Sequence, residues 1–136
     1  MAEKQGAVVV KGHEEGMKLV LSLLKEFGLP LGLLPLSDVE EVGYVKSTGY
    51  IWITQKKKTQ HIFKLIAKQV SYETEITGYI EKNRISKSKG VKANKLFVWV
   101  PVADMCVDDP PTGKIHMKSV GGLGESFPVE AFAAGQ

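Results

Sequence analysis

The chain has 136 residues, a mass of 14.9 kDa and a formal net charge of +3 at pH 7. A chain of this length buries about two thirds of its unfolded surface, so we expect residues 1–136 to form a single domain without disulfides or metal. The charge is far below that of a dedicated nucleic-acid-binding protein, and a single cysteine, Cys106, excludes an intrachain disulfide and a cysteine-based zinc site.

The N-terminal residues show no pattern of a targeting segment. Ala7–Val10 are consecutive apolar residues, but four are too few for a signal-peptide core or a membrane span. We therefore expect a cytoplasmic protein whose contact with a membrane, where it occurs, is peripheral. Residues 1–11 are expected to be a flexible N-terminal segment.

The first predicted element is an amphipathic helix over residues 13–27. Its apolar residues recur every three or four positions, and Gly28 followed by Pro30 forms the usual stop signal. A stripe of this kind packs against a sheet more often than on a lipid surface. Residues 29–36 then predict an ordered, buried connector whose leucines cover an open end of the core.

Strand patterns fill the rest of the chain. Residues 39–45 and 50–55 flank a glycine-containing loop and predict a hairpin. Residues 59–68 do not alternate cleanly and predict a strand, a bulged strand or a short helix. Further strands are predicted at 74–81, 96–103, 114–119 and 123–129, with turns at 108–113 and 121–122 and a frayed end that begins at Ala131 and includes the tail 133–136.

These elements predict a mainly β fold. We expect a single-domain antiparallel barrel-like roll or curved sheet of about six to eight strands with one N-terminal α-helix. Residues 96–103 are apolar on both faces, which is typical of a central strand, with Pro101 at its exit or at a bulge. We expect Trp52 and Trp99 to be mostly buried.

The sequence contains no recognisable nucleophile motif. Residues 122–126 include Gly-Leu-Gly-Glu-Ser, but the spacing differs from a G-x-S-x-G elbow and the segment falls in a predicted hairpin. The histidines lack the spacing and the carboxylate neighbours of a metal site and are interpreted as surface residues: His13, His61 and His116. We therefore predict no catalytic residues, no metal and no cofactor.

Two carboxylate pairs also argue against acid–base catalysis. Adjacent residues of a strand point to opposite faces and cannot share one substrate. Glu40-Glu41 is therefore interpreted as a strand entrance, and Asp108-Asp109 as part of a turn.

A ligand or membrane surface is predicted where positive charge is concentrated. Residues 82–95 carry six basic residues and no acidic one, which predicts either a contact with phosphate groups or a solvated loop. These residues are Lys82, Arg84, Lys87, Lys89, Lys92 and Lys95.

An apolar pocket is the other candidate binding site. It would combine the connector residues Leu33 and Leu34 with Trp52 and Trp99. Large aromatic residues on strands line ligand cavities in some proteins but are more often part of an ordinary core.

Several blocks of the sequence resemble a plant protein family catalogued as domain-of-unknown-function family number 538. The blocks are LGLLPLSDVEEVGYVKSTGYIWITQKKK from Leu31, VSYETEITGYIEKNRI from Val70, VDDPPTGKI from Val107, and Phe127-Pro128-Val129 with Phe132. The resemblance extends from the predicted helix to Phe132.

The resemblance implies a mainly β fold with an N-terminal helix. Roles suggested for the family are binding of lipids or other amphiphiles, by likeness to animal bactericidal permeability-increasing proteins, a part in stress response, and an esterase activity towards chlorophyll. Many members begin with a secretory signal that this sequence does not show. The family provides no agreed catalytic residues to transfer.

Our leading hypothesis is a non-enzymatic, stress-related module that binds an amphiphilic or lipid-like ligand or an anionic membrane surface. One alternative is a protein-interaction or regulatory module that exposes a sheet edge. The other is a carboxylic-ester hydrolase. Nucleic acid is not expected as a partner, and the sequence leaves the oligomeric state open.

Overall fold

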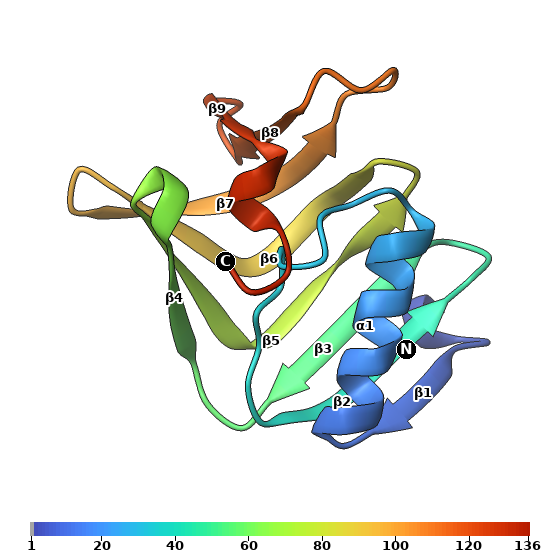
Figure 1. Ribbon diagram of the computed structural model, residues 1–136. Coiled ribbons are helices and arrows are strands. Elements are labelled where there is room, and N and C mark those ends of the chain that lie inside the picture. Colours follow the sequence, from blue (N-terminus) through green and yellow to red (C-terminus); the bar gives the residue numbers. More distant parts are fainter. Residues whose placement is uncertain (1) are drawn as a thin grey trace.

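A computed structural model describes residues 2–136, which form a nine-stranded antiparallel sheet with one α-helix (Figure 1). The strands follow the order β1-β2-β3-β5-β6-β7-β8-β9, and β4 also pairs with β5. Since β1 and β9 lie at opposite ends of this order, the sheet is an open roll. The strands are β1 Val8–Lys11, β2 Val39–Val45, β3 Tyr50–Gln55, β4 Thr59–Phe63, β5 Lys68–Glu81, β6 Arg84–Lys95, β7 Val98–Val107, β8 Lys114–Ser119 and β9 Gly124–Pro128.

The predicted fold class is confirmed, although the described residues form more strands than the six to eight expected. The helix α1 spans His13–Glu26, and Gly28, after the C-cap residue Phe27, has φ of 73°, the left-handed conformation of a helix stop. Short 3₁₀ helices occupy Ala2–Lys4 (η1), Lys64–Ile66 (η2) and Val129–Phe132 (η3). No helix in the described part of the chain has the length and apolar character needed to cross a membrane.

The helix and the connector close one side of the core. Val20 and Leu24 of α1 are buried on the sheet, as its amphipathic stripe predicts. In the connector, Leu33 and Leu34 are buried, and the backbone oxygen of Leu33 accepts a 3.0 Å hydrogen bond from the Tyr72 hydroxyl. Burial raises the pKa of Tyr72 far above its usual range, so this hydroxyl remains a donor.

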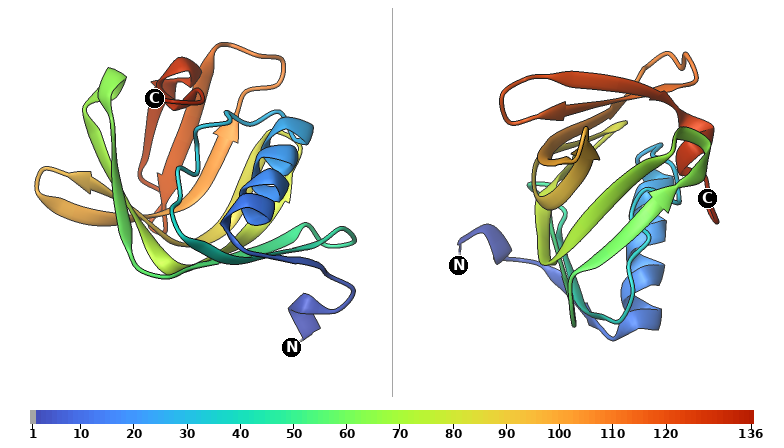
Figure 2. Two further views of the ribbon diagram at one scale, coloured as in Figure 1. Left: turned by 60° about the horizontal axis from the view of Figure 1, so that its bottom comes forward. Right: turned by 90° about the vertical axis from the view of Figure 1, so that its left-hand side faces the viewer.

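The two longest strands bend the sheet into the roll (Figure 2). The first part of β5 pairs with β4, its second part pairs with β3, and β6 follows it along both parts. Register shifts between β5 and β6 interrupt the ladder near Thr77, and Lys87 has φ of 50° there. Bulges of this kind increase twist and bend strands, so the β7–β9 end turns over the core.

Three segments differ from the prediction. A solvated loop is one of the two alternatives predicted for the basic residues 82–95, but Arg84–Lys95 forms the interior strand β6. Residues 1–11 are predicted to be a flexible segment, but Val8–Lys11 forms the strand β1, which pairs with β2. Leu96 and Phe97 are predicted to lie in a central strand but form the turn between β6 and β7, with exposed side chains. Pro101 lies within β7, next to Val102, where pairing with β8 begins.

The expectation for the two tryptophans holds only for Trp52. Its side chain is 3% exposed and lies on the sheet face opposite the core, where its indole N–H donates a 2.6 Å hydrogen bond to Glu41. The ring covers Gly43, where a Cβ would lie 2.1 Å from the indole carbon Cζ2, so no larger residue fits there. Trp99 is only partly buried and lies outside the main core.

The C-terminal segment also differs, because its first residues are part of the core. Ala131 and Phe132 are buried, and the Phe132 ring lies 4.6 Å from that of Phe63 and 6.0 Å from that of Phe127, measured between centroids. The backbone oxygen of Phe132 accepts a hydrogen bond from the N–H of Gly32. The prediction of a frayed end that begins at Ala131 is therefore wrong.

Candidate functional site

The structure does not gather the six predicted basic residues into one surface. The Arg84 guanidinium makes two hydrogen bonds to the Asp104 carboxylate. The Lys82 ammonium lies 3.3 Å from a carboxylate oxygen of Asp109, and that of Lys87 lies over the Tyr79 ring. Within β6 the side chains of Arg84, Lys87 and Lys89 are exposed, whereas those of Ile85, Ser88 and Val91 are buried. Lys89, Lys92 and Lys95 complete the set, and of these Lys95 lies beside an apolar hollow described below.

The predicted apolar pocket is also divided. Leu34 lines a void beneath α1, while Leu33 lines another beside Tyr72. Trp52 lies on the opposite face, since Ile51 and Ile53 on either side of it point into the core. Together with the position of Trp99 outside the core, this means that the four residues do not line a common pocket.

A different apolar hollow opens between β5, β7 and the β8–β9 hairpin, and we call it the trough. Its volume is about 100 Å³. Apolar side chains form its floor, and three lysines lie along its rim. The floor includes Val70, Val102, Met117, Phe127 and Phe132, and the rim lysines are Lys68, Lys95 and Lys118.

Lys68 is the most enclosed cation of the trough. Its side chain is 15% exposed, and its ammonium lies 5.7 Å from the centre of the Phe127 ring. The same ammonium lies 3.3 Å from a carboxylate oxygen of Glu125 and 3.5 Å from the backbone oxygen of Asn94. Glu125 is 43% exposed, so an anionic ligand group can replace it at Lys68 without opening the core.

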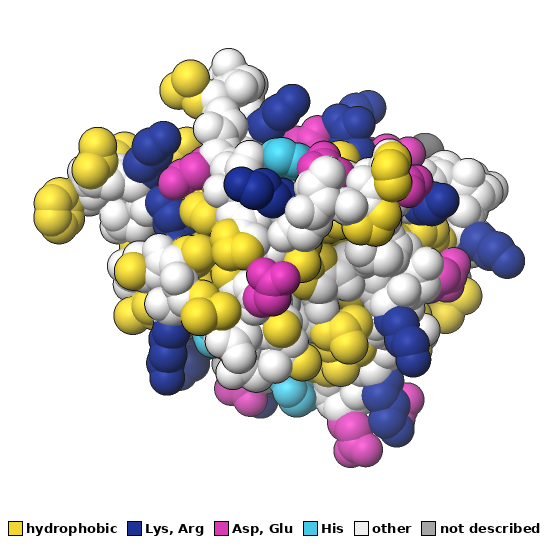
Figure 3. Space-filling view, turned by 45° about the horizontal axis from the view of Figure 1, so that its top comes forward, with side chains coloured by type: hydrophobic (Ala, Val, Ile, Leu, Met, Phe, Trp, Pro, Cys, Tyr) yellow, Lys and Arg dark blue, Asp and Glu magenta, His cyan; other side chains and the backbone are white. Residues whose placement is uncertain are grey.

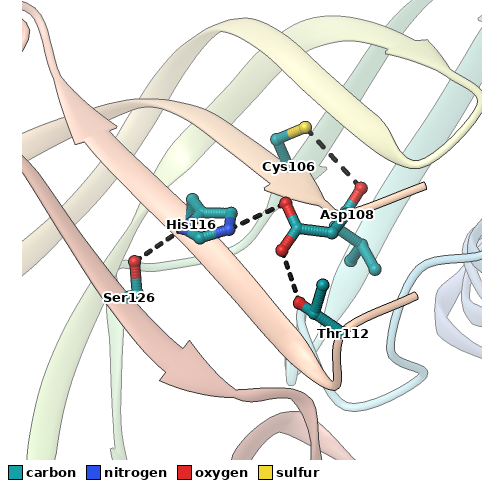
Figure 4. Close-up of polar contacts among 6 residues, drawn as sticks. Cys106, Asp108, Thr112, His116 and Ser126 are labelled. Atoms are coloured by element: carbon teal, nitrogen blue, oxygen red, sulfur yellow. Dashed lines mark hydrogen bonds and ion pairs between the residues drawn. The ribbon is translucent and has the colours of Figure 1, made fainter. Parts of the chain in front are cut away.

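A polar cluster forms a second site on the β8–β9 hairpin (Figure 4). His116 and Ser126 are direct partners in the register. Backbone hydrogen bonds join Ser119 to Leu123 and Val129 to Gly113. Hydrogen-bonded pairs recur at every second residue along the hairpin, so the pair His116–Ser126 is a non-hydrogen-bonded one. Side chains approach most closely at such pairs. The His116 Nδ1 accordingly lies 2.6 Å from the Ser126 hydroxyl.

Asp108 completes this cluster from the turn after β7. One of its carboxylate oxygens lies 2.9 Å from Nε2 of His116, and the other accepts a hydrogen bond from the Thr112 hydroxyl. The hydrogen bonds from Thr112 and His116 hold the pKa of Asp108 below its usual range. The order carboxylate, imidazole, hydroxyl is that of a nucleophilic triad.

His116 and Ser126 of the triad line a polar cleft of about 300 Å³. The cationic residues that line this cleft are Arg84, whose guanidinium is bound to Asp104, and Lys118. Motif spacing in the sequence does not reveal this cluster, because its members come from positions 108, 116 and 126. The predicted turn at 121–122 does not reveal the contact, because it would pair Met117 with Ser126, whereas the observed loop is centred on Gly121 and places His116 opposite Ser126.

The largest hollow is a groove of about 670 Å³ between the connector, the turn after β7 and the C-terminal segment. Three carboxylates and one cation line this groove: Asp108, Asp109, Glu130 and Lys82. An anionic ligand would therefore be repelled here. Among the residues that the structure describes, no three His, Cys, Asp or Glu side chains lie close enough to hold a metal ion.

Comparison with known proteins places the chain in a family. A family model described as "Protein of unknown function, DUF538" matches residues 20–133. The chain belongs to this family, as its sequence blocks indicate. No curated protein and no solved structure matches it. The matched range contains both the trough and the Asp108–His116–Ser126 triad, and it excludes β1.

Proposed function

We propose that this protein binds an amphiphile with an anionic head group, with part of its apolar chain in the trough and its head group on the rim lysines. The observation that carries this proposal is the position of Lys68, a partly buried cation at the edge of an apolar floor. A cation with little access to water interacts strongly with an anion, because the effective dielectric constant there is low.

The size of the trough limits what it holds. Its volume of about 100 Å³ is well below the roughly 300–1,000 Å³ of sites that enclose a drug-sized ligand. A whole lipid does not fit. The head group and the first part of one acyl chain do, with the rest of the chain outside, so a single-chain amphiphile such as a fatty acid is the simplest ligand.

Calorimetric titration with oleate and with oleyl alcohol tests this proposal, because the two share a chain and differ in charge. Lys68→Met keeps most of the apolar stem and removes the cation. We expect this variant to bind oleate at least about tenfold more weakly, the loss of one charge-assisted hydrogen bond, with little change for the alcohol. Lys114→Met, on β8 but outside the trough, is the matched control. Equal oleate affinity in all three proteins would contradict the proposal.

The triad supports a second candidate function, hydrolysis of carboxylic esters. In this activity the Ser126 hydroxyl attacks the ester carbonyl carbon, His116 Nδ1 accepts the hydroxyl proton, and Asp108 holds the imidazole through Nε2. His116 then returns the proton to the departing alcohol, and water releases the acid from Ser126. The distances of 2.6 and 2.9 Å around His116 favour this candidate.

Turnover of nitrophenyl butyrate tests the hydrolase candidate. We expect Ser126→Ala to reduce turnover at least about 100-fold, since removal of a nucleophile leaves only residual catalysis. Ser119→Ala, at the other end of the same hairpin, should leave turnover unchanged. A rate that Ser126→Ala does not alter, or that equals a heat-inactivated sample, would remove this candidate and leave amphiphile binding unaffected.

A further inference from the structure

Exposed apolar side chains gather on three neighbouring chain segments. They come from η2, from the turn between β6 and β7, and from the turn between β8 and β9. We call them the apolar tips: Leu65 at 61% exposure, Leu96 at 85%, Phe97 at 97%, Val98 at 61%, Val120 at 78% and Leu123 at 78%. They are six of the eleven large apolar residues that are exposed in the described chain. Single exposed apolar residues are ordinary, but such a concentration marks an interaction surface.

Lys68 brings these three segments together. It begins β5 directly after η2, its ammonium reaches the backbone oxygen of Asn94 before the β6–β7 turn, and it pairs with Glu125 after the β8–β9 turn. Figure 2 shows, in its right-hand view, η2, the β6–β7 turn and the β8–β9 hairpin in the upper part of the molecule. The trough lies between the segments, since Lys95 and Leu123 both line it.

The β6–β7 turn is strained in a way that the fold does not require. Lys95 pairs with Val98, so Leu96 and Phe97 are the two central residues of a tight hairpin. Their φ angles are 51° and 69°, the left-handed region in which bulky residues are outliers and Asn-Gly is strongly preferred. Strain retained at an exposed apolar pair points to a role outside the fold.

The charges around the tips indicate what they contact. Lys64, Lys95 and Lys118 are exposed on the same segments, and Lys68 lies between them. Glu125 is the acidic residue of these segments, and it is paired with Lys68. Figure 3 shows protruding apolar side chains beside Lys and Arg side chains at one end of the molecule. Apolar groups interleaved with cations match an anionic bilayer, which offers a negative surface above an apolar interior.

We propose that the apolar tips insert into the surface of an anionic lipid bilayer, with Lys64, Lys95 and Lys118 on the lipid head groups. This inference rests on the proposed function and extends it, because insertion places the mouth of the trough against the bilayer. An amphiphile then enters the trough from the membrane without crossing water.

Sedimentation with vesicles tests the insertion. Vesicles of phosphatidylglycerol and phosphatidylcholine are compared with vesicles of phosphatidylcholine alone, at low and high salt. The key variant is Leu96→Asn with Phe97→Gly, which substitutes the residues that this turn prefers. We expect it to fold, with a midpoint of thermal unfolding at or above that of the wild type, and to bind anionic vesicles at least about tenfold more weakly.

Charge variants provide a matched control. Changing Lys64, Lys95 and Lys118 to Glu should abolish binding to anionic vesicles. The same change at Lys46, Lys56 and Lys57, in the turns that flank β3, should reduce it only modestly, although the net charge is identical. Binding should weaken with salt in the wild type. A Phe97→Trp variant should in addition be quenched by brominated lipid, which separates insertion from adsorption.

The outcomes separate this inference from the proposed function. Three results would overturn the insertion. They are vesicle binding that the Leu96→Asn, Phe97→Gly variant does not change, no vesicle binding by the wild type, and equal vesicle binding by the two charge variants. Oleate binding without vesicle binding would support the proposed function and overturn the insertion. Vesicle binding without oleate binding would support the insertion and overturn the proposed function. A wild-type dimer that the tip variant converts to a monomer, without vesicle binding, would instead assign the tips to self-association.

Discussion

Polar contacts around Trp52 hold strands together on the sheet face opposite the core. Glu41 accepts the indole N–H, and its other carboxylate oxygen lies 2.7 Å from the ammonium of Lys11 on β1. These contacts join β1, β2 and β3 through one carboxylate. They act only while that carboxylate is ionised, so the hydrogen bonds from Lys11 and Trp52 lower the pKa of Glu41.

The lowered pKa gives Glu41→Gln a pH-dependent effect. Because the folded state favours the ionised form, Glu41 stabilises the protein above its unfolded pKa, near 4.5, and this contribution disappears as the pH falls through the lower folded value. We expect Glu41→Gln to cost about 1 kcal/mol at pH 7 and almost nothing in acid below both values. Urea unfolding at pH values from 7 down to 2.5 measures the difference. A cost that is constant over this range would show that the charge is irrelevant.

At the scale of elements, prediction from sequence worked where the alternation was regular. The hairpin β2–β3 has the predicted bounds, because Gly49 adopts a positive φ in the loop and the strands alternate on either side. In β6 the buried residues are Ile85, Ser88 and Val91, at a spacing of three. Positive φ angles at Lys87 and Gly90 add bulges that break the period of two, so the strand pattern was hidden.

The two candidate sites also differ in how far the sequence alone predicts them. The His116–Ser126 contact depends on the register of one local hairpin, and a shift by one residue around Gly121-Gly122 would put Met117 opposite Ser126. The trough depends on how far β5 and β6 bend, which brings Lys68 near Glu125 from positions 57 residues apart. Sequence periodicity contains no measure of that bend. The wrong assignment of Leu96 and Phe97 has a related cause, because apolar residues are rarely expected in a tight turn.

The C-terminal helix η3 is a structural element of the core, and Phe132 is the residue that anchors it. Its ring is 1% exposed and packs against Phe63 of β4 and Phe127 of β9. We expect Phe132→Ala to lower the free energy of unfolding by about 3–5 kcal/mol, the cost of an aromatic cavity in a packed core. Deletion of residues 133–136 should cost less than about 1 kcal/mol, because these residues are exposed. Urea unfolding compares the two variants, and an equal cost would refute this assignment.

At the scale of the whole molecule, two long strands and one connector join two halves. The first half consists of α1 with β1–β3, and the second of β7–β9 with η3. β5 and β6 run through both halves, and the Gly32 N–H donates a hydrogen bond to the Phe132 backbone oxygen across them. A single buried cluster extends from Val20 of α1 to Phe127 of β9. No boundary therefore exists at which one half opens without exposing the core of the other.

This continuity predicts cooperative thermal unfolding of the entire chain. We expect one calorimetric transition with an enthalpy of roughly 95 kcal/mol near 60 °C, from about 0.7 kcal/mol per residue, and equal calorimetric and van't Hoff enthalpies. Phe132→Ala should shift this transition to lower temperature as a unit, although the substitution lies entirely in the second half. Two resolved transitions in the variant, with the first containing only part of the enthalpy, would mean that the α1 half folds independently. Differential scanning calorimetry of both proteins distinguishes these results, because the ratio of the van't Hoff enthalpy to the calorimetric enthalpy falls below one when parts unfold separately.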